Sequence, residues 1–298
     1  IDSGSLVFVV EHKAKYFVDM ADELYVMREG TIVKRYQARD LESKDVLDDL
    51  DRLGIDMSLR INRRALTSRS RRVIARAEDL LIGYREDNPL VEVESLDIAE
   101  GECIAVVGPN GSGKTALLKT LSGFLKPISG SFNVMGVDLH RSKISVRRGL
   151  VFYVSQHPDY MFFSRTVEGE LKHIHRSSSI NEILSKSTWI QRHLKSSPYR
   201  LSMGQKRWLS IAISMAYSPK ILMLDEPTVG LDYSMYRDLI SLLDSLRKRG
   251  LAIIIATHDP RLIADLCDRA LLISGGTLVE KDPVELALEL ERIAGVSL

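Results

Sequence analysis

Residues 102–115 have the pattern of a strand, a glycine-rich turn and the start of a helix. This stretch limits the possible folds of the chain more than any other. The apolar run ECIAVV at 102–107 predicts a buried strand, GPNGSGKT follows, and the helical pattern ALLKTLSGFL comes next. Glycines let a backbone curl around an anion, and the positive end of a helix favours negative charge. The stretch therefore predicts a phosphate-binding P-loop within an α/β fold.

Every position of this loop has an expected part in binding a nucleotide. Lys114 is expected to reach the β- and γ-phosphates, and Thr115 to place its hydroxyl on Mg²⁺. The residues predicted to hold the phosphates are Gly108, Pro109, Asn110, Gly111, Ser112, Gly113, Lys114 and Thr115.

A second apolar strand ends in two carboxylates, in the sequence ILMLDEPT at 221–228. Ligands of parallel α/β sheets bind at the carboxyl ends of the strands. Asp225 is therefore expected to bind Mg²⁺, and Glu226 to polarise the attacking water. The alternative, a pair that caps a helix, fits the preceding apolar strand and the following Pro227 less well.

Composition excludes several classes of protein. Apolar residues make up 45% and charged residues 27%, as in a soluble globular chain, and 298 residues suggest about two domains. The net charge of +1 gives no general case for nucleic-acid binding. Two cysteines cannot form a disulfide framework or a four-cysteine zinc site, and neither a secretory signal nor a spanning apolar run is evident. We therefore expect a cytosolic protein.

The chain contains an internal repeat. Residues 7–33 align without a gap to residues 253–279 at a constant offset of 246, pairing His12 with His258 and Gly30 with Gly276. Matching residues at one offset predict a duplication. We expect that residues 1–38 are the end of a first copy, most of which is absent from this chain.

Two stretches separate this tail from the second copy. Residues 39–55 have the apolar spacing of a short amphipathic helix, and residues 57–76 are rich in arginine. The arginines are typical of a solvated linker, and a surface for anionic lipid or a partner is the alternative. Residues 39–76 are thus predicted to be an interdomain segment. From residue 77 to 298, alternating strands and helices predict a mainly parallel sheet.

Further motifs stand in the order of the ATP-binding cassette (ABC) ATPases, and the sequence resembles that family over roughly residues 77–280. LSMGQ at 201–205 is similar to the family's LSGGQ signature, with Met203 where glycine is usual. The other matches are Tyr84 to the A-loop aromatic, Gln156 to the Q-loop, Gly230–Asp232 to the D-loop and His258 to the switch histidine. The resemblance implies a P-loop NTPase fold with an antiparallel β subdomain and a helical subdomain at about 157–205.

The resemblance also implies a role for each matching residue, with ATP and Mg²⁺ as cofactors. Tyr84 would stack on adenine, Gln156 would bind Mg²⁺ or hold the water, and His258 would bond the γ-phosphate. The implied catalytic residues are Glu226, His258, Gln156 and Lys114, and the implied metal ligands are Thr115, Gln156 and Asp225.

In the family, two cassettes enclose two ATP molecules head to tail, so the signature of one cassette serves the site of the other. Ser202, Gly204 and Gln205 would therefore face a partner's nucleotide, and Asp232 would lie at the same interface. His12 would be the switch histidine of the first copy. The expected cassette partner is the missing first copy or a second copy of this chain.

Residues 155–171 (SQHPDYMFFSRTVEGEL) resemble the Q-loop region of energy-coupling-factor (ECF) importers, with His157 where asparagine is common. This implies import of a vitamin or metal ion, with integral membrane subunits as partners and a peripheral position on the cytoplasmic face. Phe162 and Phe163 would form a groove for a coupling helix, or would fill the junction with the helical subdomain.

Other functions remain open on the sequence alone. A soluble ABC ATPase acting in translation or DNA repair is the alternative, and a catalytically dead regulatory cassette is a third possibility. No nucleic-acid partner is expected. His173 and His175, two residues apart, do not share a helix face and are interpreted as surface residues.

Overall fold

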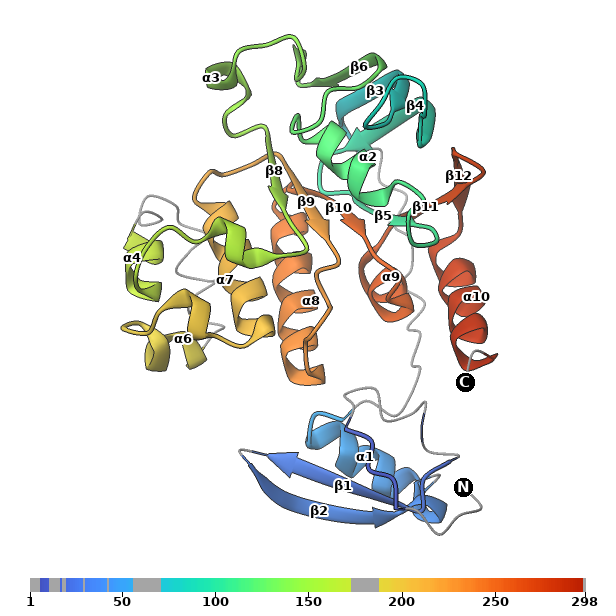
Figure 1. The fold of residues 1–298 in the computed structure, drawn as a ribbon, viewed down its shortest axis with the longest axis vertical. Helices are drawn as coiled ribbons and strands as arrows, with labels where there is room; N and C mark the ends of the chain where they lie inside the picture. Colours follow the sequence, from blue (N-terminus) through green and yellow to red (C-terminus); the bar gives the residue numbers. More distant parts are fainter. Residues whose placement is uncertain are drawn as a thin grey trace.

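The computed structural model describes residues 6–10, 17, 20–28, 30–41, 43–55, 71–172 and 188–296. His12, His173, His175 and the linker residues 56–70 lie outside the described residues. Figure 1 shows a small N-terminal unit and a larger unit built on one sheet. Among the described helices, none has the length and apolar character needed to cross a membrane.

The larger unit is built on a ten-stranded sheet with the order β7-β6-β3-β4-β12-β11-β5-β10-β9-β8. Its parallel part consists of β11, β5, β10, β9 and β8, and the strands β3, β4, β6 and β7 form an antiparallel part. The bounds are β3 Val73–Ile82, β4 Val91–Ala99, β5 Cys103–Val107, β6 Ser129–Val134, β7 Val137–Asp138, β8 Val151–Val154, β9 Ile221–Asp225, β10 Ala252–Ala256, β11 Arg269–Ser274 and β12 Thr277–Lys281.

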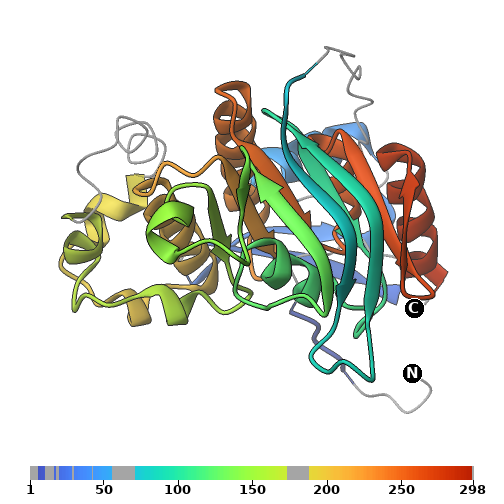
Figure 2. The ribbon, with the colours of Figure 1, turned by 90° about the horizontal axis from the view of Figure 1, so that it is seen from above.

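Helices cover both faces of the parallel part, as Figures 1 and 2 show. One face packs on α2, and the other packs on α7, α8 and α9. The central strands β5, β9 and β10 are buried at every residue, which explains their unbroken apolar sequences. The helix bounds are α2 Lys114–Leu121, α3 Ile144–Arg147, α4 Val167–Lys172, α6 Thr188–His193, α7 Met203–Met215, α8 Tyr233–Lys248, α9 Pro260–Leu266 and α10 Pro283–Val296, with 3-10 turns η4 Pro158–Met161 and η5 Pro198–Arg200.

This arrangement confirms the predicted α/β fold with an antiparallel β part and a helical part. Strand β3 begins at Val73, inside the stretch that the sequence assigns to the linker. The start of this strand resembles a linker in the sequence because it contains a charged residue. Arg76 lies on the exposed face of the strand and pairs with Asp97 of β4 at 2.6 Å.

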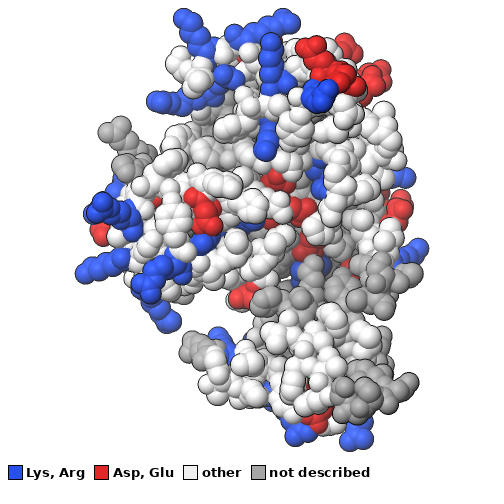
Figure 3. Space-filling model, in the orientation of Figure 1, with Lys and Arg blue, Asp and Glu red and all other residues white. Residues whose placement is uncertain are grey.

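Basic side chains gather around α3, at the top of Figure 3, where the sequence reads HRSKISVRRG.

The N-terminal unit is an antiparallel hairpin followed by a helix. Strands β1 (Glu23–Arg28) and β2 (Thr31–Gln37) lead through the turn η3 (Ala38–Asp40) to α1 (Lys44–Arg52). Its small core contains Val26, Tyr36, Leu41 and Leu50. The hairpin has the form that the repeat predicts, since β1 and β2 begin 246 residues before β11 and β12.

Candidate nucleotide-binding and hydrolysis site

The P-loop connects β5 to α2 at the carboxyl edge of the parallel strands. Gly113 has a φ of +103°, and a Cβ there would lie 2.5 Å from Cγ2 of Val91. The position therefore requires glycine for both its conformation and its packing. The loop backbone and the first turn of α2 form the kind of cradle in which N–H groups face an anion.

Two polar side chains of the loop bear on its fit to phosphate. Lys114 is buried, and its Nζ donates to the carbonyl oxygens of Gly108 at 2.7 Å and Pro109 at 3.0 Å. Ser112 Oγ is buried without a hydrogen-bond partner among the described residues. A basic side chain and an unpartnered hydroxyl within one glycine-rich loop suit a nucleotide phosphate.

Asp225 ends β9 and is almost fully buried, with 2% of its surface exposed. Its Oδ2 atom accepts two hydrogen bonds, from Thr115 Oγ1 at 2.8 Å and from the Tyr153 hydroxyl at 2.9 Å. The structure thus brings together two of the three residues predicted to bind Mg²⁺, and both offer side-chain oxygens, which are the ligands that this ion prefers.

Glu226 and His258 also meet at this edge. Register explains the contact, because Asp225 lies beside Ala256 in the neighbouring strand β10. The His258 Nδ1 atom lies 2.8 Å from Glu226 Oε1. The Glu226 side chain is mostly buried, whereas that of His258 is 61% exposed. Glu226 has a φ of +48°, a left-handed conformation that is uncommon for this residue type and is often found at functional sites.

The signature residues form the start of α7. Ser202 caps the helix, and its side chain and that of Gln205 exchange hydrogen bonds with each other's backbone N–H. Gly204 is buried, and a Cβ there would lie 2.8 Å from Met235 Sδ. Asp232 caps α8 by accepting from the Met235 backbone N–H. The predicted signature and D-loop residues therefore lie next to each other.

Tyr84 and Gln156 are placed at the surface. Tyr84 follows β3 and is 61% exposed, and Gln156 follows β8 and is exposed as well. The Gln156 side chain is not joined to Thr115 or Asp225 by a described hydrogen bond, although its backbone is held in place. Both residues keep their predicted roles as hypotheses.

Two cations of α7, which the sequence patterns did not identify, hold the Q-loop. Arg207 is 1% exposed and donates to the carbonyl oxygens of Ser155 at 2.6 Å and Gln156 at 2.8 Å. Burial lowers the pKa of the Arg207 guanidinium. Lys206 forms an ion pair with Asp159 at 2.8 Å. The sequence signal for Arg207 is a charged residue within a helix whose neighbouring residues are mostly apolar.

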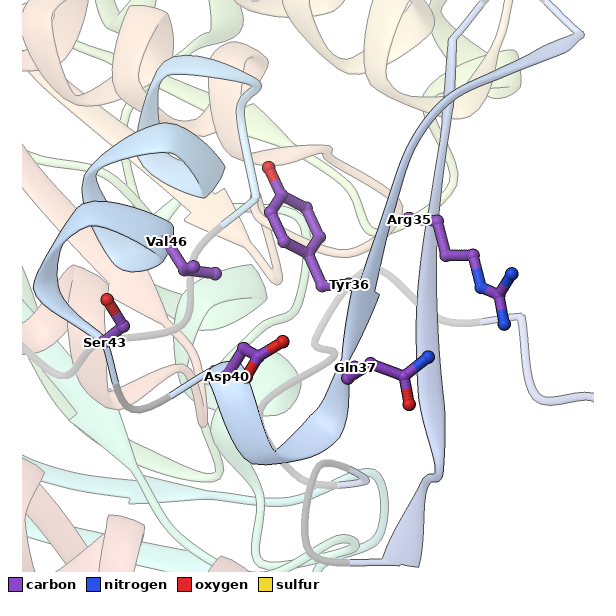
Figure 4. Close-up of a pocket in the computed structure, with 6 residues that line it drawn as sticks. All are labelled: Arg35, Tyr36, Gln37, Asp40, Ser43 and Val46. Atoms are coloured by element: carbon purple, nitrogen blue, oxygen red, sulfur yellow. The ribbon is translucent and has the colours of Figure 1, made fainter.

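Two of the cavities in the described parts bear on the nucleotide site and on the N-terminal unit. One of about 710 Å³ lies beside the P-loop and is lined by Pro109–Ser112, Leu272–Gly276, Pro89 and Leu90. The other, of about 520 Å³, lies between β2 and α1 of the N-terminal unit. In Figure 4, Tyr36 and Val46 face each other across this second cavity, and Arg35 points away from it. Only the first cavity adjoins residues predicted to bind a nucleotide.

Comparisons with known proteins agree with this site. The family model described as ABC transporter matches residues 91–229. An ABC transporter ATP-binding protein of Pyrococcus horikoshii is 36% identical over 208 residues, which cover 67% of this chain and 80% of that protein. A Treponema denticola protein of the same description is 31% identical over 305 residues, and the alignment covers 97% of this chain but 60% of the relative.

Solved structures show the same fold. CbiO1 from Clostridium perfringens, described as part of the ABC transporter complex cbiONQ, has a TM-score of 0.62 and 29% identity over 75% of this chain and 94% of that one. The cassette MJ0796, solved as a dimer with ADP and Pi, has a TM-score of 0.60 and 22% identity over 70% of this chain and 99% of that one. The fold and the site define an ATP-binding cassette. The chain belongs to the ABC transporter ATP-binding proteins, a family of ATPases coupled to transport.

Proposed function

We propose that the cassette whose first strand, β3, begins at Val73 binds and hydrolyses Mg·ATP at the P-loop edge of the sheet. One observation carries this proposal: Thr115 with Asp225, and Glu226 with His258, each meet within 2.8 Å at this edge. Phosphoryl transfer depends mainly on positioning and electrostatic stabilisation, and these pairs are placed to supply both.

Each residue has a distinct part in this mechanism. Lys114 and the P-loop backbone hold the β- and γ-phosphates, and Thr115 and Asp225 hold the ion. When bound, Mg²⁺ neutralises charge on the phosphate oxygens. Glu226 accepts a proton from the attacking water as the water oxygen bonds to the γ-phosphorus in line with the leaving oxygen. The bond from the γ-phosphorus to the oxygen that bridges to the β-phosphate breaks, and ADP and phosphate are the products. His258 keeps the Glu226 carboxylate oriented through its Nδ1 contact.

The remaining residues act around this centre. Tyr84 stacks on the adenine, and Gln156 holds the water or contacts the ion. Ser202, Gly204, Gln205 and Asp232 face the nucleotide of a partner cassette. That pairing agrees with the exposure of Ser202 and Asp232 at adjoining helix starts.

We also propose that residues 1–38 are the C-terminal part of another cassette. The segment that follows them joins it to the cassette that begins with β3 at Val73 and whose helical subdomain spans about 157–205. The matched hairpins β1-β2 and β11-β12 support this. The Phe8 and Val9 side chains are exposed, whereas their repeat counterparts Ile254 and Ile255 are fully buried in β10. His12 is then the switch histidine of the other cassette. The chain spans 60% of the Treponema relative that it matches along nearly its full length.

The transporter of which this ATPase is part is proposed to be an ECF-type importer of a vitamin or metal ion. The likeness to cbiO1, a part of the transporter complex cbiONQ, supports this. The integral membrane subunits would bind near the Q-loop, with the cassette peripheral on the cytoplasmic face. Phe162 is buried in the core, so Phe163, which is exposed, is the available contact. The Pyrococcus and Treponema relatives favour transport over a soluble role in translation or DNA repair.

Two experiments test these proposals. The first measures ATP binding and hydrolysis over a range of chain concentrations, with Lys114→Ala as the control. We expect Mg·ATP binding at every concentration and turnover per chain that rises as chains pair. Brisk turnover that is independent of concentration would refute the requirement for a partner signature.

In the second experiment, the protein is purified from gently solubilised membranes and the co-purifying proteins are identified. Membrane subunits among them would support the proposed importer function, and ribosomes or repair factors without a membrane subunit would contradict it.

A further inference from the structure

The Tyr153 side chain reaches the nucleotide site from a strand to which no function has been assigned. Tyr153 pairs in register with Met223 on the neighbouring strand β9, and Asp225 lies two residues further along β9. Residues two apart on a strand share a face, so Tyr153 and Asp225 lie on the face that packs against α2. The phenol hydroxyl donates to Asp225 Oδ2 at 2.9 Å.

Two donors converge on that one carboxylate oxygen, since Thr115 Oγ1 donates to Asp225 Oδ2 at 2.8 Å. One donor comes from β8 and the other from α2, two elements that are separate in the chain order. Together they fix the rotation of a carboxylate that is almost fully buried. If Thr115 turns its hydroxyl oxygen toward an ion, Tyr153 still holds the carboxylate.

The surroundings keep Tyr153 in this role. An ordinary tyrosine hydroxyl keeps its proton at neutral pH and is therefore a donor to a carboxylate. The Phe124 ring lies against the Tyr153 ring with centroids 5.9 Å apart, which limits its movement. Groups that hydrogen-bond to metal ligands orient those ligands and tune metal affinity.

We propose that Tyr153 is a positioning residue for the Mg²⁺ of the nucleotide, acting by holding the Asp225 carboxylate beside the Thr115 hydroxyl. This inference rests on the proposed function of the P-loop site. It concerns the gain in nucleotide affinity that Mg²⁺ provides, rather than nucleotide affinity itself.

The test is Tyr153→Phe, which removes the hydroxyl and keeps the ring. A matched control is Tyr236→Phe, because the Tyr236 hydroxyl also donates to a carboxylate, Asp265 Oδ2 at 2.7 Å, between α8 and α9. Calorimetry measures the Kd of ATP for each protein, once with excess Mg²⁺ and once with a chelator. We expect Tyr153→Phe to bind metal-free ATP as the unaltered chain does, while the gain from Mg²⁺ falls about tenfold. In Tyr236→Phe, both constants stay unchanged.

The outcomes separate this inference from the proposed function. An unchanged gain from Mg²⁺ in Tyr153→Phe overturns the role of Tyr153 and leaves the nucleotide site intact. Equal weakening of metal-free and Mg²⁺-bound ATP also overturns it, since the hydroxyl would then support the fold or the nucleotide rather than the ion. If the unaltered chain binds no ATP, the proposed function and this inference both fail.

Discussion

His258 Nδ1 lies 2.8 Å from Glu226 Oε1, although 32 residues separate the two in the sequence. Parallel strands β9 and β10 lie side by side, and both residues follow the carboxyl ends of these strands. The Glu226 backbone N–H also donates to the Ala256 carbonyl oxygen at 2.9 Å, which continues the ladder past the end of β9. The carboxylate is therefore fixed by its backbone and by the imidazole.

Replacement of Glu226 by glutamine tests its assignment as the base. Glu226→Gln keeps the shape of the side chain but cannot accept a proton from water. We expect ATP binding to persist and turnover to fall about 10²–10⁴-fold. Steady-state hydrolysis and equilibrium binding, measured on the same preparation, distinguish the two effects. Glu280→Gln, which removes a carboxylate on the exposed strand β12, is the control and should leave both unchanged. Near-normal hydrolysis by Glu226→Gln would refute the assignment.

The parts of the site that could be predicted from sequence are those that depend on the ends of single strands. GPNGSGKT after one apolar strand and Asp225-Glu226 after another are local patterns, and the sheet brings them to one edge. The contacts of Tyr153 and Arg207 depend instead on which strands and helices become neighbours. β8 lies beside β9 although about 70 residues separate them, and no local pattern reports that order. The left-handed φ of Glu226 likewise follows from the surrounding structure.

Arg207→Met should loosen the Q-loop. The variant keeps much of the length of the side chain, but the Ser155 and Gln156 carbonyl oxygens lose a charged donor inside the protein. We expect a loss of about 2–4 kcal/mol in the free energy of unfolding. Hydrogen exchange should also accelerate at residues 155–157. Urea denaturation and exchange followed by mass spectrometry provide the two measurements.

Lys206→Met is the matched control for that change. It removes the neighbouring cation, whose single ion pair with Asp159 is closer to solvent. A pair of this kind contributes about 1 kcal/mol or less. If both variants lose the same stability and the same protection at the Q-loop, Arg207 has no special part in holding it.

Two glycines of the P-loop allow the energetic cost of a left-handed backbone to be measured separately from the cost of a steric collision. Gly111 and Gly113 both have positive φ, +82° and +103°, but only at Gly113 would a Cβ meet a neighbour, Val91 Cγ2 at 2.5 Å. Alanine at either position therefore costs about 1–2 kcal/mol for the left-handed backbone. Gly113→Ala should cost about 1–3 kcal/mol more for the collision. Thermal unfolding of the two variants gives the comparison, and equal costs would contradict the close approach of Val91 to Gly113.

Asp268, directly before β11, joins three parts of the chain. Its Oδ2 atom accepts from Arg71 Nη1 at 2.7 Å, Arg247 Nη1 at 2.6 Å and the Cys103 backbone N–H at 2.9 Å. Burial acting alone would raise the pKa of this carboxyl, but the three hydrogen bonds outweigh it and hold the pKa below its ordinary value. The ionised form therefore stabilises the fold.

Asp268→Asn should lower the free energy of unfolding by about 2–3 kcal/mol at neutral pH. Because the folded state holds the pKa down, the unfolded chain binds the proton more readily, and stability is lost as the pH falls through the folded pKa. The difference between Asp268→Asn and the unaltered chain should thus be constant above about pH 5 and shrink below about pH 4. Asp97→Asn, in a more exposed pair, should cost about 1 kcal/mol or less. Urea denaturation at a series of pH values measures both, and a difference that grows in acid would show that Asp268 does not stabilise the fold through its charge.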